Sequence, residues 1–399
     1  MFVLVVEFIA FFLYITELFR AKRCIEKETK KSRLFMVEGL PGTGKSTNSF
    51  KLYMRLIQNG EKVRWIHEVS QPHPTVFFSE AVFTKNEYRL FLKKYPQVAE
   101  KLNSIADFRL STVGIDFETI SRKFPGSEKE TWYQELLKYD MMNSSLEKYE
   151  GIAIDKWKCF AWKAMKNKDE IVVMDSSIFQ YQIFTYLLKN AKVERVVNFV
   201  KKVGEIIKPL RPSLVYLYRD NVEDAIAFMR KERGEESLRK IWERDRVQPY
   251  YENKTKDASA YYDFLRDYFK YTISLFKCLE CNKIALDISE QDWEKYEVLI
   301  LDFLNITHEQ TNEYKAPDGT FYNATYDVSI TIKDNHLLDP EGTTHLLIAK
   351  SPREYFVENL PTILQFEDNI ELRIVGQQII PKWTETGLIY MREYNNEKI

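Results

Sequence analysis

The sequence predicts an α/β domain built on a parallel, doubly wound sheet, followed by a small all-β domain. The first prediction rests on five short apolar runs, rich in β-branched residues, that alternate with longer segments of helical periodicity. These runs are almost continuously hydrophobic, which is typical of parallel strands covered by helices on both faces. The second prediction rests on a change of pattern after about residue 310, where short alternating runs are separated by turn sequences such as PDGT, DPEGTT and TETG.

The expected elements divide most of the chain into two domains, as its length also suggests. The α/β domain is expected over 33–306, with strands at 34–38, 62–68, 170–175, 213–218 and 283–288. Residues 80–165 show helical spacing and no convincing strand, so we expect a helical insertion between the second and third strands. Residues 310–399 are expected to form a barrel or sandwich of about 80 to 90 residues.

Residues 1–32 form a hydrophobic and basic extension ahead of this domain. Residues 1–19 are apolar except for a few positions, including Glu7 and Glu17, and are about long enough to span a bilayer. The flank at 20–33 carries seven Lys or Arg residues, which would remain on the cytoplasmic side of a membrane. Three alternatives stay open: a membrane anchor, a docking helix, and a start codon placed too far upstream. All three leave the main domain in the cytoplasm.

Composition and charge narrow the classes of function. The chain of 399 residues is 45% hydrophobic and 29% charged, which is ordinary for a soluble globular protein. Its formal net charge is −1, so no nucleic-acid partner is expected. The four cysteines are too few for a disulfide scaffold. The chemistry therefore has to be sought in local motifs.

The most specific motif is MVEGLPGTGKST at 36–47, which contains the spacing G-x-x-x-x-G-K-S between an expected strand and an expected helix. Its glycines let backbone N–H groups wrap phosphate oxygens, Lys45 would reach the β and γ phosphates of ATP, and the Ser46 hydroxyl would bind Mg²⁺. We expect the nucleotide to be bound by Gly39, Pro41, Gly42, Thr43, Gly44, Lys45, Ser46 and Thr47.

Two acidic residues end expected strands at the ligand-binding edge of the sheet. Glu68 is placed to accept a proton from a substrate hydroxyl, although a solvated loop glutamate is an equal alternative. Asp175 could bind Mg²⁺ through water. A motor ATPase commonly has a second acid next, where this chain has Ser176, and this weakens the hydrolysis hypothesis. His67 would point to the opposite face of its strand and is expected to be structural.

A candidate lid follows the fourth expected strand. Arg230 and Arg233 are one helical turn apart, and Gly234 can end or bend their helix. Guanidinium groups beside a glycine hinge suit a lid that closes over a transferring phosphate. An exposed helix laced with salt bridges is the alternative. Weaker candidates from the same region are Arg239, Arg244 and Arg246.

Together, MVEGLPGTGKST, VRWIHE, VVMDSSIFQ and YLYRDNVEDAIAFMRKERGEE resemble the P-loop kinases of nucleosides and nucleotides, and their layout is closest to deoxyribonucleoside kinases and thymidylate kinases. The resemblance covers roughly 33–305 and implies that Glu68 is the general base and RKERGEE the lid. The chain departs from that group after the third strand, where an acidic-Arg motif is replaced by Asp175, Ser176 and Ser177. The whole chain also resembles an uncharacterised family of bacterial P-loop proteins.

These features predict a Mg²⁺–ATP-dependent phosphotransferase with Lys45, Glu68, Asp175, Arg230 and Arg233 as catalytic residues and Ser46 and Asp175 at the metal. The acceptor is expected to be a small molecule with a hydroxyl group. Two alternatives stay open. One is an ATPase switch whose β-rich tail binds a protein partner, and the other is a nucleotide-binding module without turnover. A GTPase is disfavoured because no N-K-x-D motif occurs.

Overall fold

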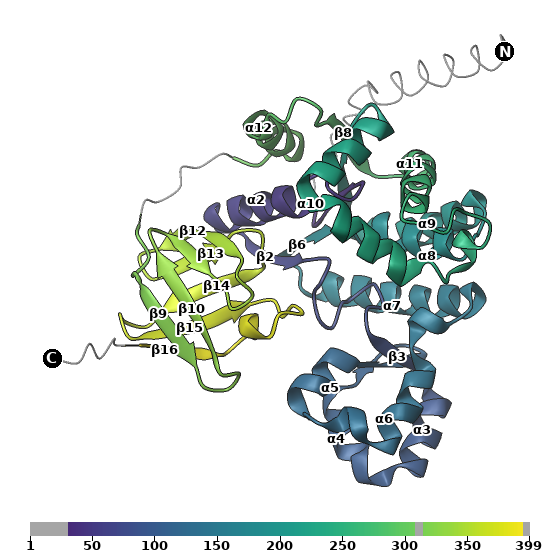
Figure 1. Cartoon of the computed structure of the whole chain (residues 1–399), viewed down its shortest axis with the longest axis horizontal. Coiled ribbons are helices and arrows are strands. Elements are labelled where there is room, and N and C mark those ends of the chain that lie inside the picture. Colours follow the sequence, from purple (N-terminus) through teal and green to yellow (C-terminus); the bar gives the residue numbers. More distant parts are fainter. Residues whose placement is uncertain (1–30, 308–313, 394–399) are drawn as a thin grey trace.

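A five-stranded parallel sheet forms the centre of the larger domain (Figure 1). The computed structural model describes residues 31–307 and 314–393. Residues 1–30 of the N-terminal extension lie outside the described part, and no helix within the described part is long and apolar enough to cross a membrane. The strand order is β2 (Lys62–Ile66), β6 (Glu170–Asp175), β1 (Leu34–Gly39), β7 (Pro212–Tyr218) and β8 (Asn282–Asp287).

All neighbouring strands of this sheet are parallel, as the apolar runs predict. The five expected strands are confirmed to within one or two residues. The second strand ends earlier than expected, at Ile66, so Glu68 lies in the following loop. Because the strands are parallel, their carboxyl ends meet at one edge of the sheet, and this edge carries the residues discussed below.

Alternate side chains of each strand point to opposite faces, and helices cover both. On one face, Phe35 and Val37 of β1 pack under α2 and α12. On the other, Leu34 and Met36 pack under a larger group of helices. The helices of the domain are α2 (Lys45–Gln58), α7 (Leu146–Lys166), α8 (Gln180–Leu188), α9 (Val193–Ile207), α10 (Val222–Asp245), α11 (Ala260–Cys278) and α12 (Trp293–Leu304).

The insertion is not wholly helical, which corrects the expectation for 80–165. It contains a small antiparallel sheet of β3 (Glu80–Thr84), β5 (Thr112–Asp116) and β4 (Asp107–Phe108). These strands are short and β3 and β5 are largely buried, so they show little of the alternation by which a strand is recognised. The helices around them are α3 (Lys85–Lys94), α4 (Ala99–Ile105), α5 (Phe117–Lys123) and α6 (Thr131–Leu136).

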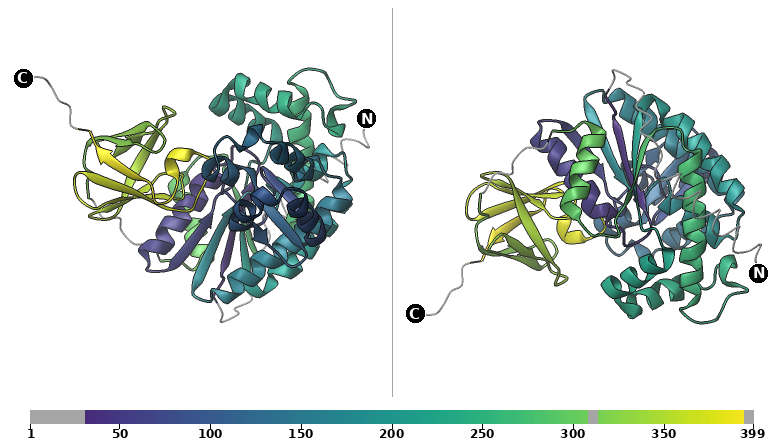
Figure 2. Two further views of the ribbon diagram at one scale, coloured as in Figure 1. Left: turned by 90° about the horizontal axis from the view of Figure 1, so that it is seen from below. Right: turned by 90° about the horizontal axis from the view of Figure 1, so that it is seen from above.

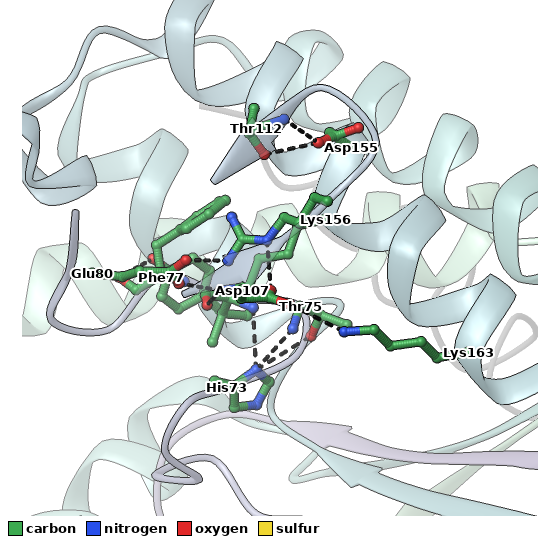
Figure 3. Close-up of polar contacts among 12 residues, drawn as sticks. His73, Thr75, Phe77, Glu80, Asp107, Thr112, Asp155, Lys156 and Lys163 are labelled. Carbon is green, nitrogen blue, oxygen red and sulfur yellow. Dashed lines mark hydrogen bonds and ion pairs between the residues drawn. The ribbon is translucent and has the colours of Figure 1, made fainter. Parts of the chain in front are cut away.

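A buried ionic network fastens the small antiparallel sheet of the insertion to α7 (Figure 3). The Glu80 carboxylate at the start of β3 pairs with Lys156 of α7 and with Arg109, and all three side chains are almost completely buried. Lys156 also donates to the Val76 carbonyl at 2.6 Å. Asp155, the next residue of α7, accepts from the Thr112 hydroxyl at 2.8 Å. Because the charges are desolvated, this network holds the insertion in one orientation only while every partner is present.

The C-terminal domain is a closed barrel of eight antiparallel strands, so the barrel alternative is confirmed. Its interior is filled by apolar side chains that include Phe321, Leu337 and Tyr390. The strands are β9 (Gly319–Asn323), β10 (Val328–Lys333), β11 (His336–Leu338), β12 (Thr344–Ser351), β13 (Glu354–Val357), β14 (Thr362–Phe366), β15 (Glu371–Gly376) and β16 (Ile389–Arg392).

The barrel lies beside α2, as both views in Figure 2 show. Phe356 of β13 packs against Phe50 and Tyr53 of α2, with ring centroids 6.4 and 5.9 Å apart. The loop after β2 reaches the barrel too, because the Gln71 N–H donates to the Gln378 carbonyl at 2.9 Å. The barrel is therefore attached both to the helix that follows the glycine loop and to the loop that carries Glu68.

Candidate functional site

A pocket of about 600 Å³ opens at the carboxyl edge of the sheet, within the size range of small-molecule sites. Its floor is the glycine loop between β1 and α2, and the lining residues from this loop are Pro41, Gly42, Gly44, Lys45, Ser46 and Thr47. Glu68 and Gln180 line one part, and Arg233 of α10 lines another. Side chains from distant parts of the sequence therefore meet above one loop.

Glycine is required in this loop by conformation and by space. Gly42 and Gly44 have φ of 82° and 76°, a region that other residues rarely adopt. A Cβ on Gly39 would lie 2.4 Å from the Leu217 carbonyl oxygen. Gly44 is the N-cap residue of α2. It has no side chain that could accept a hydrogen bond from the N–H groups in the first turn of this helix. Such uncapped N–H groups favour an anion.

Lys45 lies in this loop with its side chain almost completely buried. Its Nζ donates to the Leu40 carbonyl at 2.9 Å, across the loop. Burial lowers the pKa of Lys45 below its usual value, and the nearby carboxylates of Glu68, Glu38 and Asp175 partly oppose this effect. The Lys45 amino group is thus placed near three acidic side chains, whose negative charge favours its protonated form.

Ser46 and Asp175 provide neighbouring oxygen atoms at the start of α2 and the end of β6. Burial raises the pKa of Asp175, and a hydrogen bond with the Ser46 hydroxyl works against that rise. The Ser49 hydroxyl also donates to Asp175 Oδ2 at 3.2 Å. Within the described ranges no cluster of three or more His, Cys, Asp or Glu side chains could hold a metal ion. The hydroxyl and carboxylate fit Mg²⁺ when phosphate and water supply the other ligands.

Glu68 points into the pocket from the loop after β2. Its Oε2 accepts a hydrogen bond from Gln180 Nε2 at 2.9 Å. Burial raises the pKa of Glu68, but the charge of Lys45 and the hydrogen bond from Gln180 contribute to a net pKa below the usual value. These surroundings favour the ionised form of the Glu68 carboxylate. His67 is buried, and its Nδ1 accepts from the Val69 N–H at 3.2 Å, as a structural residue would.

Glu38 is a buried acid that the sequence analysis passed over. It lies in β1 directly before the glycine loop and is fully buried. Its carboxylate accepts backbone hydrogen bonds from Ile178 N at 2.7 Å, Phe179 N at 3.1 Å and Gln180 N at 3.1 Å. Burial raises the pKa of Glu38 to about 7. The signal for it was present, since an acid inside the apolar run LFMVEG requires partners.

The two arginines of the expected lid have different surroundings. Gly234 has φ of 76° and ψ of 153°, so it kinks α10 as the sequence suggests. Arg233 lines the pocket, and its charge lowers the pKa of Lys45. Arg230 is not among the lining residues; it pairs with Glu235 and lies over the ring of Tyr262, 5.5 Å from its centroid. The structure thus brings one of the two to the site.

Among the weaker candidates, Arg244 lines the pocket. It makes two hydrogen bonds of 2.7 Å to the carboxylate of Asp245. Arg239 instead pairs with Glu236 and Glu243 on the exposed side of α10. Arg239 and Arg244 lie on the same part of α10 after the kink, and the packing of this helix decides which of them faces the pocket.

The pocket also has aromatic walls that the sequence analysis did not identify. Trp293, at the start of α12, lies so close to the glycine loop that a Cβ on Gly44 would be 3.0 Å from its Cζ3. Further lining residues are Phe184, Phe228 and Tyr261. They come from α8, α10 and α11, so only folding gathers them. A site with a cationic, glycine-lined floor and aromatic walls suits a ligand with phosphate groups and a planar ring.

No protein-family model matches this chain, and no curated protein matches it in sequence. Fold and site together define its structural class: a doubly wound α/β domain with a ligand-sized pocket at the carboxyl edge of its sheet, joined to a closed eight-stranded barrel.

Proposed function

We propose that this protein is a P-loop phosphotransferase that moves the γ phosphate of Mg²⁺–ATP to a hydroxyl group of a small molecule. The observation that supports this most directly is that Lys45, Glu68 and Arg233 line the same pocket above the glycine loop. A phosphate cradle, a carboxylate base and a cation near the transferring group are features that phosphoryl transfer uses.

In this proposal the ATP phosphates lie on residues 39–47. The N–H groups at the start of α2 and the Lys45 ammonium bind the phosphate oxygens, and Trp293 offers a flat face for the base. Ser46 and Asp175 would hold Mg²⁺, which when bound neutralises charge on the phosphate oxygens. The proposed reaction uses this single Mg²⁺ ion.

Glu68 would act on the acceptor. Its ionised carboxylate takes the proton of the acceptor hydroxyl while that oxygen forms a bond to the γ phosphorus. The bond between the γ phosphorus and the bridging oxygen breaks, and ADP leaves. Gln180 Nε2 donates to Glu68 Oε2 at 2.9 Å and so holds this carboxylate in place. Arg233 would stabilise the charge on the transferring group.

The test is a screen of the purified full chain for ADP release. Nucleosides, nucleotides, sugars and antibiotics with hydroxyl groups are supplied with ATP and Mg²⁺, and products are identified by mass spectrometry. A kinase releases ADP only with a particular acceptor and yields its phosphorylated form in equal amount. Lys45→Ala should abolish turnover. Glu68→Gln should slow transfer roughly 10²- to 10⁴-fold with ATP affinity kept, whereas Glu223→Gln, on an exposed pair with Arg266, serves as the control.

Other outcomes identify the alternatives. Steady hydrolysis without an acceptor would contradict the kinase and support an ATPase switch. ATP binding without turnover in any condition would support a nucleotide-binding module. Normal transfer by Glu68→Gln would remove Glu68 from the role of base while leaving the phosphotransferase in place.

A further inference from the structure

Glu38 joins two segments of the site that are far apart in the sequence. It is the last residue of β1 before Gly39, and its two carboxylate oxygens together accept the N–H groups of Ile178, Phe179 and Gln180. These N–H groups belong to the start of α8, which has no side-chain cap of its own. The Glu38 carboxylate of β1 therefore accepts the N–H groups that an N-cap side chain of α8 would otherwise accept, although α8 lies more than a hundred residues later in the sequence.

A fully buried carboxylate is costly unless its surroundings compensate for it. Charged and titratable groups face Glu38 from several elements. The Lys45 ammonium lowers the pKa of Glu38, and Tyr216 of β7 and Tyr268 of α11 lie close enough for Glu38 to raise their pKa values. An amide at position 38 would cost less to bury but would turn an NH₂ group toward backbone donors. Only an acceptor at both oxygens satisfies this geometry.

The start of α8 in turn carries the hydrogen bond to Glu68. Gln180 is the first residue of α8, its backbone N–H donates to Glu38 Oε2, and its side-chain Nε2 donates to Glu68 Oε2. A continuous hydrogen-bonded path therefore runs from Glu38 through Gln180 to Glu68. Moving or tilting the first turn of α8 would withdraw Gln180 Nε2 from the Glu68 carboxylate.

We propose that Glu38 is a positioning residue that fixes the first turn of α8 so that Gln180 holds the Glu68 carboxylate at the acceptor. This rests on the proposed role of Glu68 as the base, and it assigns to Glu38 no contact with substrate. Glu38 acts on Glu68 through Gln180, so loss of either residue should have the same consequence for the Glu68 carboxylate.

The first test follows the Gln180 side-chain amide by NMR in protein labelled with ¹⁵N-glutamine, at a pH above the raised Glu38 pKa of about 7. The resonance is assigned by its loss in Gln180→Leu. Glu68→Ala should shift it by removing its acceptor, and Glu38→Gln should shift it in the same direction. Glu223→Gln, an exposed and unconnected change of the same kind, should leave it in place. A wild-type Gln180 resonance in Glu38→Gln would overturn the proposal.

The second test uses the acceptor identified in the ADP screen. Glu38→Gln and Gln180→Leu should each lower kcat by up to about 10²-fold with KM for ATP nearly unchanged. The double variant should be no slower than the slower single variant, because both changes break one path. Additive losses would overturn the proposal. If Glu38→Gln does not fold, Glu38→Asp, which keeps the charge and shortens the reach, is measured in both tests with the same expectations.

The two tests separate the proposals. A protein without phosphotransferase activity removes the proposed function but leaves the NMR result to decide whether Glu38 positions Gln180. An active enzyme with an unshifted Gln180 resonance keeps the proposed function and rejects the role of Glu38.

Discussion

Gln180 Nε2 donates a hydrogen bond to Glu68 Oε2 at 2.9 Å, across 112 positions of sequence. The two residues meet because β2 and β6 are parallel neighbours, so that the segments following them leave the same edge of the sheet. The bond fixes one carboxylate oxygen of Glu68, whose side chain also lines the pocket. This pairing gives the loop after β2 a defined position next to Lys45.

Arg233 and Arg230 form a matched pair for testing the lid. Arg233→Ala should lower the rate of phosphate transfer roughly 10²- to 10³-fold, because the pocket loses a cation at the transferring group. Arg230→Ala should change the rate less than about threefold, since its guanidinium pairs with Glu235 outside the pocket lining. Steady-state kinetics of both variants decide the matter, and equal losses would contradict the assignment of Arg233 alone.

Trp293 should contribute to nucleotide affinity. Its ring lies against Gly44 at the edge of the glycine loop, where it can stack on a base. Trp293→Ala should weaken binding of a non-hydrolysable ATP analogue by about 1–3 kcal/mol, the usual range for a stacked base. Trp293→Phe should restore part of the affinity. Calorimetric titration with the analogue and with inorganic triphosphate tests this, because only the analogue carries a base; equal weakening of both would point to damage of the loop instead.

Removal of Glu80 should strongly destabilise the protein. Glu80→Ala leaves the buried cations of Lys156 and Arg109 without their carboxylate, at a cost of about 3–5 kcal/mol. Lys163→Ala breaks the pair with Asp107, in which Lys163 is 53% exposed, and should cost no more than about 1 kcal/mol. Urea unfolding of both variants measures the difference. Similar costs would mean that Glu80 and its partners contribute no more than surface pairs.

Stability should depend on pH through Glu38. Its pKa rises from 4.5 to about 7 on folding, because burial disfavours the charged form. A group whose pKa is raised in the folded state contributes stability that is full below pH 4.5 and is lost as the pH rises through about 7.

Glu38→Gln removes this titration. Relative to the wild type, the free energy of unfolding of the variant should therefore rise by roughly 3 kcal/mol between pH 4.5 and about 7. This figure follows from about 1.36 kcal/mol for each unit of pKa. Denaturant melts of both proteins from acidic to mildly alkaline pH give the two curves. Parallel curves would show that Glu38 titrates alike in the folded and unfolded chains.

Much of the α/β domain could be predicted because its strands are buried on both faces and therefore stand out as apolar runs. The glycine loop could also be predicted, because its spacing places Gly42 and Gly44 at positions that need a positive φ. The insertion was predicted as helical because β3 and β5 are short and buried and show little alternation. The ionic network that anchors them joins Glu80, Lys156 and Arg109, which are distant in sequence.

The sequence by itself determined the order of elements, the loop above which the pocket forms, the acid that follows β2 and the acid that ends β6. Local periodicity and backbone conformation are written into neighbouring residues, so they can be read without a fold. Tertiary structure alone decided that Arg233 rather than Arg230 reaches the pocket, and that Glu38, Gln180 and Glu68 form one hydrogen-bonded path. These contacts depend on the parallel pairing of β2, β6 and β1 and on the kink in α10, which bring together groups that are far apart in the sequence.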